Sequence, residues 1–113
     1  MVLIVDDDHD IRETLAAIVQ NAGCEVATAS NGREALDFLR SHAAPTLVLL
    51  DLMMPVVDGW QVVAEMRANA SMASIPICVI SAARLGAPGA DVVLEKPLDV
   101  DRLMEVVHSF CGC

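Results

Sequence analysis

Polar side chains stand where four short apolar runs of this sequence end. Asp6 and Asp7 follow the first run, Asp51 and Ser81 each end another, and Lys96 comes soon after the last. If these runs are parallel strands of one sheet, their carboxyl ends share a rim, and open α/β sheets bind ligands at that rim. An aspartate just past a strand can also be an ordinary cap or turn residue. Four such groups at one rim favour a functional site.

The acidic residues of this predicted rim would repel one another. At about 5 Å and an effective dielectric constant near 20, each pair of carboxylates costs on the order of 3 kcal/mol, so a cluster of Asp6, Asp7 and Asp51 calls for a cation. Oxygen ligands favour Mg²⁺, which keeps several water molecules and often shares a phosphate. The alternative is an acidic surface without a metal. Their position after buried strands favours the metal site.

Lys96 is the single lysine of the chain, and the other six basic residues are arginines. Its compact ammonium at an acidic rim is suited to act as a point charge for a phosphate or for Asp51 itself. Ser81 would add a short hydroxyl donor. A carboxylate nucleophile, a metal, an ammonium and a hydroxyl together predict phosphoryl transfer, with Asp51 becoming an acyl phosphate.

The elements that would position these residues alternate along the chain. Apolar runs predict strands at 2–5, 25–29, 46–50, 75–80 and 92–94. Apolar residues at helical spacing predict helices that begin near 10, after 30–32, near 58 and after 99, with Asp58 and Asp99 at or next to their starts. Such alternation predicts an α/β fold, a doubly wound parallel sheet with right-handed crossovers.

The connection between the fourth and fifth strands is unusually short. It has ten residues, 82 to 91, and these include Gly86, Pro88 and Gly89. A crossover with its own helix needs roughly ten to twelve residues, and glycine and proline weaken helices. We therefore expect this fourth helix to be short or absent, and the segment to be mobile until Asp51 is modified.

Composition limits the possible functions. The chain has 113 residues, which fits one domain over residues 1–113, and its net charge of -9 argues against nucleic-acid or membrane-surface binding. No apolar run approaches the roughly 18 to 20 residues of a membrane span, so we expect a cytoplasmic protein. Its four cysteines form no C-x-x-C pair, and we expect them to be reduced. Proteins and cations are the expected partners.

Four segments, in this order, resemble the receiver domains of two-component response regulators. They are Val5-Asp6-Asp7, the stretch from Asp51-Leu52-Met53-Met54-Pro55 to Asp58-Gly59, Ser81-Ala82, and Lys96-Pro97. Each is weak alone, but the resemblance covers the whole chain. It implies a flavodoxin-like, five-stranded sheet with strand order 2-1-3-4-5. It also implies a domain that catalyses only its own phosphorylation and dephosphorylation.

The resemblance implies a role for each site residue. Asp51 would accept phosphate from a sensor histidine kinase or a phosphotransfer protein and relay the signal to an output protein or effector domain. Asp7, Asp51 and the backbone carbonyl of Met53 would bind Mg²⁺, and Asp6 would assist through its water shell. Ser81 would contact the phosphoryl group and Lys96 would pair with it. The Lys96-Pro97 peptide bond is expected to be cis.

The sequence departs from the family pattern at Val93. Receivers usually carry there an aromatic ring, whose rotation reports phosphorylation, and valine has no ring to rotate. Together with the short crossover, this keeps open a second reading, a receiver-like binding module that does not switch. A third interpretation, an aspartate-nucleophile phosphatase, would require a second aspartate at the position of Met53.

Overall fold

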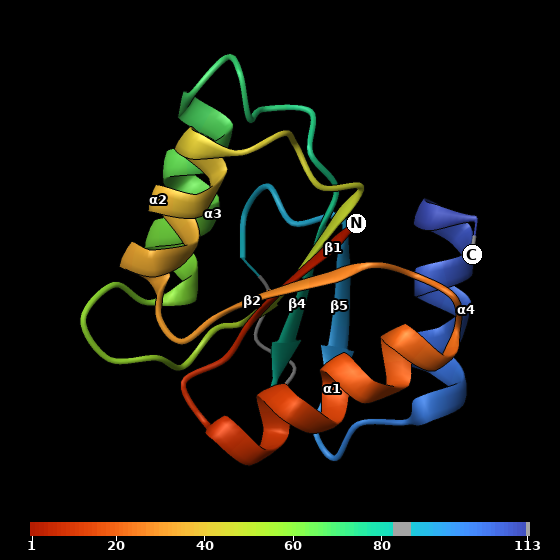
Figure 1. The fold of residues 1–113 in the computed structure, drawn as a ribbon. Coiled ribbons are helices and arrows are strands. Elements are labelled where there is room, and N and C mark those ends of the chain that lie inside the picture. The colour runs from red at the N-terminus through yellow and green to blue at the C-terminus, as the bar shows by residue number, and fades with distance from the viewer. Residues whose placement is uncertain (83–86, 113) are drawn as a thin grey trace.

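The computed structural model describes residues 1–82 and 87–112. Five parallel strands form one sheet in the order β2-β1-β3-β4-β5 (Figure 1). They are β1 (Val2–Val5), β2 (Val26–Ala29), β3 (Leu47–Asp51), β4 (Ile77–Ser81) and β5 (Val92–Glu95). The helices of the described residues are α1 (His9–Asn21), α2 (Gly32–Ser41), α3 (Gly59–Ala68) and α4 (Val100–Cys111). The predicted flavodoxin-like, doubly wound sheet and its strand order are confirmed.

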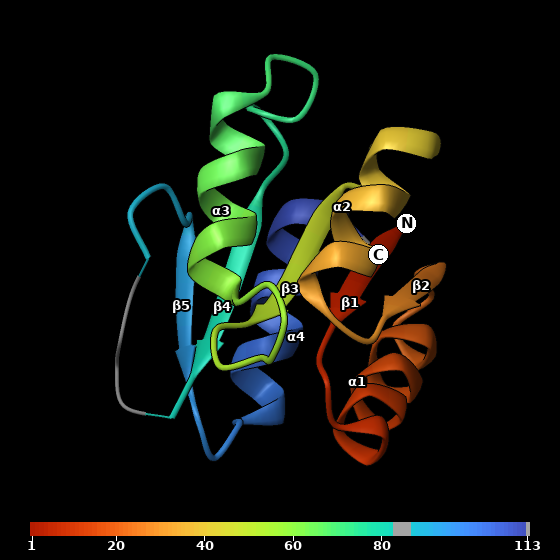
Figure 2. The same cartoon turned by 90° about the vertical axis from the view of Figure 1, so that its left-hand side faces the viewer.

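Burial on both faces explains why the central strands are continuously apolar. Every residue of β1, β3 and β4 is buried. Along β3, Val48 and Leu50 pack in the core beneath α2 and α3, and Leu47 and Leu49 pack in the core beneath α1 and α4. Figures 1 and 2 show the two helix pairs on opposite faces of the sheet. Because successive strand side chains point to opposite faces, a strand covered on both sides needs apolar residues throughout.

Side-chain caps fix where the helices begin. The N-caps are Asp8, Asn31, Asp58 and Asp99, and each accepts hydrogen bonds from main-chain N–H groups of its helix. Asp58 forms a capping box with Gln61. Each cap follows a strand closely, so all four helices start at the carboxyl rim of the sheet. The predicted helix starts near 30–32, 58 and 99 are confirmed.

The connection between β4 and β5 holds no helix in its described part, which is residue 82 and residues 87–91. Gly89 has φ 93°, and Ala87 is buried in the core beneath α2 and α3. This agrees with the prediction of a short or absent helix at this point. Residues 83–86, on which the prediction of a mobile segment falls, lie outside the described residues.

Two apolar helix residues are partly exposed. Ile11 is 39% exposed and Phe110 is 37% exposed. Both lie in terminal turns of their helices, where α1 and α4 extend past the sheet, since a helix of 12 or 13 residues is about 18 to 20 Å long and a strand of four residues is about 13 Å. Ile11 instead lines a groove between α1 and the start of α4, with Leu98 and Val100.

The prediction that all four cysteines are reduced is wrong for Cys24, which is disulfide-bonded. The lack of a C-x-x-C pair says nothing about cysteines that approach each other through the fold. Cys78 and Cys111 are free thiols. Burial inside β4 raises the pKa of the Cys78 thiol to about 12, so this thiol stays protonated at neutral pH.

No helix formed by residues 1–82 and 87–112 combines the length and the apolar character that crossing a membrane requires.

The loop between β3 and α3 contains a strained residue. Val56 has φ 70° and is 79% exposed. A branched Cβ in this left-handed region meets the neighbouring backbone and costs roughly 1 to 2 kcal/mol. Because this side chain is so exposed, it has no buried contacts that compensate for the cost. The strain therefore lowers the free energy of unfolding.

We expect Val56→Gly to stabilise the domain, because glycine adopts this conformation without strain. The strain relieved, less the entropy that glycine adds to the unfolded chain, should leave a gain of up to about 1 kcal/mol in the free energy of unfolding. Urea denaturation measures this. Val56→Ala is the matched control, because it removes the exposed methyl groups but keeps Cβ, and it should gain less. A glycine variant no more stable than wild type would contradict the strain.

Candidate functional site

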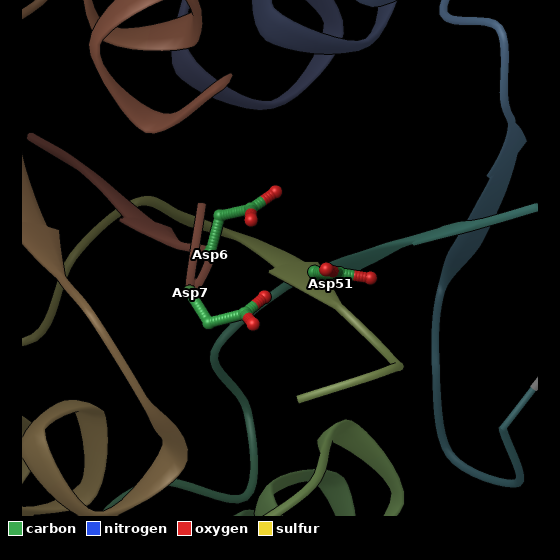
Figure 3. Close-up of side chains that lie close together, drawn as sticks. All are labelled: Asp6, Asp7 and Asp51. Atoms are coloured by element: carbon green, nitrogen blue, oxygen red, sulfur yellow. The ribbon is translucent and has the colours of Figure 1, made fainter. Parts of the chain in front are cut away.

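Three carboxylates meet at the carboxyl rim of the sheet, between β1 and β3 (Figure 3). Asp6 follows β1 and Asp51 ends β3, and the pairing of Val5 with Leu50 makes these strands neighbours. One carboxylate oxygen from each of Asp6, Asp7 and Asp51 can be chosen so that all lie within 4.8 Å of one another. Asp6 is 1% exposed and Asp51 is 4% exposed, whereas Asp7 is open to solvent. The predicted cluster is therefore present, with two of its acids buried.

The carboxylate of Asp6 is only half satisfied. Its Oδ1 accepts a hydrogen bond from the Asp8 amide at 2.9 Å, but its buried Oδ2 has no hydrogen-bond partner among the described residues. Burial is the main reason why the pKa of Asp6 is raised above its ordinary value of 3.8. The Asp8 amide and the charge of Lys96 oppose the rise, and the charges of Asp51 and Asp7 add to it.

Lys96, which follows the edge strand β5, brings a positive charge to Asp51. Its Nζ lies 3.5 Å from Asp51 Oδ1, and the same oxygen accepts a hydrogen bond from the Met53 amide at 3.1 Å. The main chain of Lys96 is also fixed, since its amide donates to the Ser81 carbonyl at 2.9 Å. The Lys96-Pro97 peptide bond is cis, as the resemblance implied. Asp51 thus has one oxygen oriented by an amide and an ammonium.

Ser81 and Met53 lie where the sequence placed them, but their roles stay predictions. Ser81 is the last residue of β4 and is 1% exposed. It follows Ile80, which pairs with Asp51 on β3, so Ser81 reaches the same rim on the neighbouring strand. The side chain of Met53 is 61% exposed, and its amide holds Asp51. This leaves the Met53 carbonyl as the atom predicted to contact a metal.

The donor set fits a hard divalent cation. All the clustered groups are carboxylates, which is the ligand type that Mg²⁺ prefers. The unpartnered buried oxygen of Asp6 is the specific sign, because buried polar atoms nearly always have a partner and an ion with its water shell would supply one. Neutralisation of the cluster would also remove the repulsion between Asp6 and Asp51.

Two residues that the sequence analysis did not assign to the site help to shape it. Arg12 Nη1 donates to the main-chain carbonyl of Asp6 at 2.9 Å and so fixes the backbone of the acidic turn. The sequence feature that could have indicated this role is an arginine in the first turn of a helix, where the helix dipole disfavours positive charge. Gly59 lets α3 begin close to β3, since a Cβ there would lie 2.6 Å from Leu52 Cα and 2.8 Å from the Asp51 carbonyl oxygen.

Comparison with known proteins gives a consistent result. The family model described as "Response regulator receiver domain" matches residues 2–108. Response regulator Rre1 of Synechocystis is 36% identical over 115 residues, which cover 95% of this chain and 49% of the relative. Protein PilG of Pseudomonas aeruginosa is 30% identical over 115 residues, which cover 96% of this chain and 84% of the relative. The chain thus spans about half the length of the Synechocystis protein.

Solved structures agree with these sequence relatives. The chemotaxis protein CheY4 of Vibrio cholerae superposes with a TM-score of 0.85 at 30% identity, over 96% of both chains. A CheY-like receiver domain protein of Methanospirillum hungatei gives a TM-score of 0.86 at 30% identity, over 98% of this chain and 93% of the other. The fold, the acidic cluster and the matched family model lead to one conclusion: the chain belongs to the response regulator receiver domain family.

Proposed function

We propose that this domain accepts a phosphoryl group on Asp51, in a Mg²⁺-dependent reaction, from a phosphohistidine of a sensor histidine kinase or of a phosphotransfer protein. The observation that carries the proposal is the setting of Asp51. It is a 4% exposed carboxylate at the end of the central strand, 3.5 Å from the Lys96 ammonium and clustered with two further acids. A group held in this way is suited to act as a nucleophile.

In the proposed transfer, a carboxylate oxygen of Asp51 forms a bond to phosphorus while the phosphorus–nitrogen bond of the donor breaks. The bonding pair returns to the imidazole, which takes up a proton from solvent. The Met53 amide and Lys96 hold Asp51 in a fixed orientation, which lowers the entropic part of the barrier. Mg²⁺ bound by Asp7, Asp51 and the Met53 carbonyl, with Asp6 assisting through its water shell, would offset the charge of the phosphoryl oxygens.

Two residues act on the transferred group in this proposal. Lys96 turns from Asp51 toward a phosphoryl oxygen, where its charge stabilises the product. The Ser81 hydroxyl, on the neighbouring strand, donates to another phosphoryl oxygen. Ser81 and Lys96 reach the group from β4 and β5, whereas Asp6 and Asp7 follow β1, on the other side of Asp51. The phosphoryl group would therefore lie between the ammonium and the metal site.

The proposed role in the cell follows from this chemistry. The phosphorylated domain would relay a two-component signal in the cytoplasm to an output protein or effector domain, and the domain would catalyse only its own phosphorylation and dephosphorylation at Asp51. The net charge of -9 favours a protein partner over nucleic acid.

One observation favours a second candidate function, a receiver-like binding module that does not switch. Val93, which stands where receivers usually carry a mobile ring, is 40% exposed on β5. A phosphorylation assay with acetyl phosphate and Mg²⁺ separates the two functions, because a binding module of this kind would take up no phosphate.

Incubation with acetyl phosphate and Mg²⁺ should add one phosphate to the wild-type domain, detected as an increase in intact mass. Asp51→Asn should abolish the adduct, because an amide is not a nucleophile for this reaction. The matched control is Asp37→Asn, which changes an exposed aspartate of α2. An adduct that persists in Asp51→Asn, or its absence from the wild type, would sink the assignment.

Saturating Mg²⁺ should raise the melting temperature of the wild-type domain. At ten times its dissociation constant, a ligand stabilises the fold by about 1.4 kcal/mol, equivalent to roughly 5 °C for a domain of this size. Asp7→Ala should lose most of this gain. Glu65→Ala removes one exposed acid from α3, away from the rim, and should keep it. Equal responses of the Asp7 variant and the wild type would show that Asp7 is not a ligand.

Asp6→Asn should stabilise the metal-free domain at neutral pH, by about 1 kcal/mol, because it replaces a buried carboxylate, one oxygen of which lacks a partner, with a neutral amide. The pKa of Asp6 is raised in the folded state, so its penalty is absent below pH 3.8, grows as the pH rises from 3.8 to the raised pKa, and is fully present above it. The stability difference between the variant and the wild type should therefore increase with pH. Urea denaturation in the presence of a chelator, at several pH values, measures this difference. A difference that stays constant with pH would contradict the predicted cost of ionising the buried Asp6.

A further inference from the structure

The side chain of Arg67, in the last turn of α3, makes a dense set of hydrogen bonds outside the acidic site. Its Nε donates to the Gly89 carbonyl at 2.8 Å, and its Nη2 donates to Asp91 Oδ2 at 2.9 Å. Its Nη1 donates to the carbonyls of Ala73 at 2.9 Å and Ile75 at 2.8 Å. The side chain is 24% exposed. One guanidinium thus contacts four acceptors, a geometry that its planar fork allows and an ammonium does not.

These contacts join the segments that lead into the last two strands. Ala73 and Ile75 precede β4, and Gly89 and Asp91 precede β5. Asp91 closes the link in two ways, because its Oδ2 accepts the Ile77 amide at 2.8 Å and its own amide donates to the Ile77 carbonyl at 2.9 Å. Through Arg67 and Asp91, the first residue of β4 and the residue before β5 are fixed to each other and to α3.

Strand β5 has limited other support, because Leu94 is the one of its four residues that is buried, in the core beneath α1 and α4. It is four residues long, it lies at the edge of the sheet, and it pairs only with β4 (Figure 2). The connection that precedes it has ten residues, and its described part holds no helix to cover the strand. A short edge strand specifies its register weakly unless a turn or a side chain fixes it. The contacts of Arg67 and Asp91 provide that constraint at the amino end of β5.

The register of β5 determines where Lys96 lies. From Asp91, opposite Ile77, the pairing runs without a bulge to Ser81 opposite Glu95, and the Lys96 amide then bonds the Ser81 carbonyl. A slip of one residue would move the backbone of Lys96 by about 3.3 Å and turn its side chain to the other face. Its Nζ is now 3.5 Å from Asp51 Oδ1, so such a slip would break this contact.

We propose that Arg67 and Asp91 are positioning residues for the phosphoryl-transfer site, which fix the register of β5 and thereby hold the Lys96 ammonium beside Asp51. This inference rests on the function proposed above for Lys96. Neither residue touches the acidic cluster, and both act from the opposite end of β5.

The first test is the rate of phosphate uptake from acetyl phosphate with saturating Mg²⁺. Arg67→Lys keeps the charge but cannot bind four acceptors, and it should slow uptake by about tenfold or more, since small misplacements of a catalytic group cost up to a hundredfold. Asp91→Asn keeps an oxygen that can accept from Ile77 and Arg67, and should be much milder than Asp91→Ala. Arg40→Lys, the same change at an exposed arginine of α2, should leave the rate unchanged.

The second test asks whether Arg67 acts through Lys96. In a Lys96→Ala background, Arg67→Lys should cause no further loss, because the group that it positions is gone. The affinity for Mg²⁺ should also be unchanged in Arg67→Lys, since the acids follow β1 and end β3, which β5 does not contact. An equal loss of rate in both backgrounds, or a parallel loss of Mg²⁺ affinity, would mean that Arg67 supports the whole fold rather than Lys96, and would overturn the inference.

A structural measurement separates this inference from the proposed function. Amide hydrogen exchange in Arg67→Lys should accelerate at Asp91 and Lys96, which bond across to β4, and not at Asp6, which bonds to Ala29 on the other side of the sheet. If the wild type takes up no phosphate, the proposed function fails, and exchange still decides whether Arg67 fixes β5. Normal uptake by Arg67→Lys, or unchanged exchange at Lys96, would overturn the positioning role alone.

Discussion

The burial of like charges at one rim of the sheet is the constraint on which the rest of the structure depends. Asp6 and Asp51 are 1% and 4% exposed, and burial is the main cause of the raised pKa of Asp6. The metal-free fold therefore holds these acids together against repulsion and desolvation. The free energy that compensates for this cost comes from burial of the apolar residues of β1 and β3, which are covered on both faces by helix layers. A strongly apolar centre is thus the condition for a charged site at its edge.

The positive side of the site depends on weaker support. Lys96 follows β5, an edge strand with one neighbour, whereas Asp51 ends the central strand. The described part of the connection between β4 and β5 contains no helix that could cover this strand. It instead contains a turn at Gly89 and the hydrogen bonds of Arg67. Hydrogen bonds to main-chain carbonyls are directional, so they fix a register with little buried area. This is how a shortened connection remains compatible with a precisely placed ammonium.

The sequence was sufficient for the strands and for the carboxylates at their ends, because both depend on local patterns, whereas the order of the strands came from the family resemblance. Continuous apolar runs identified the buried strands, their polar ends identified the rim, and Asp58 and Asp99 marked helix starts. The features it could not supply depend on contacts between distant segments. Nothing near Arg67 in the sequence indicates Gly89 or Asp91, 22 and 24 residues away, and the disulfide of Cys24 has no local signature. Helical spacing alone also does not reveal the partial exposure of Ile11, because it does not show where the sheet ends.

Helix α3 connects the two halves of the site. At its amino end, Gly59 packs against the backbone of Leu52 and Asp51, and its last turn carries Arg67, which fixes the start of β5. Asp51 ends β3 and Lys96 follows β5, and β4 lies between these two strands, so neighbouring strand pairing does not join the two residues directly. A ten-residue helix is a stiff element about 15 Å long, and it gives both strands a common reference. The distance between the Asp51 carboxylate and the Lys96 ammonium is therefore set by the contacts at both ends of α3 as well as by the sheet.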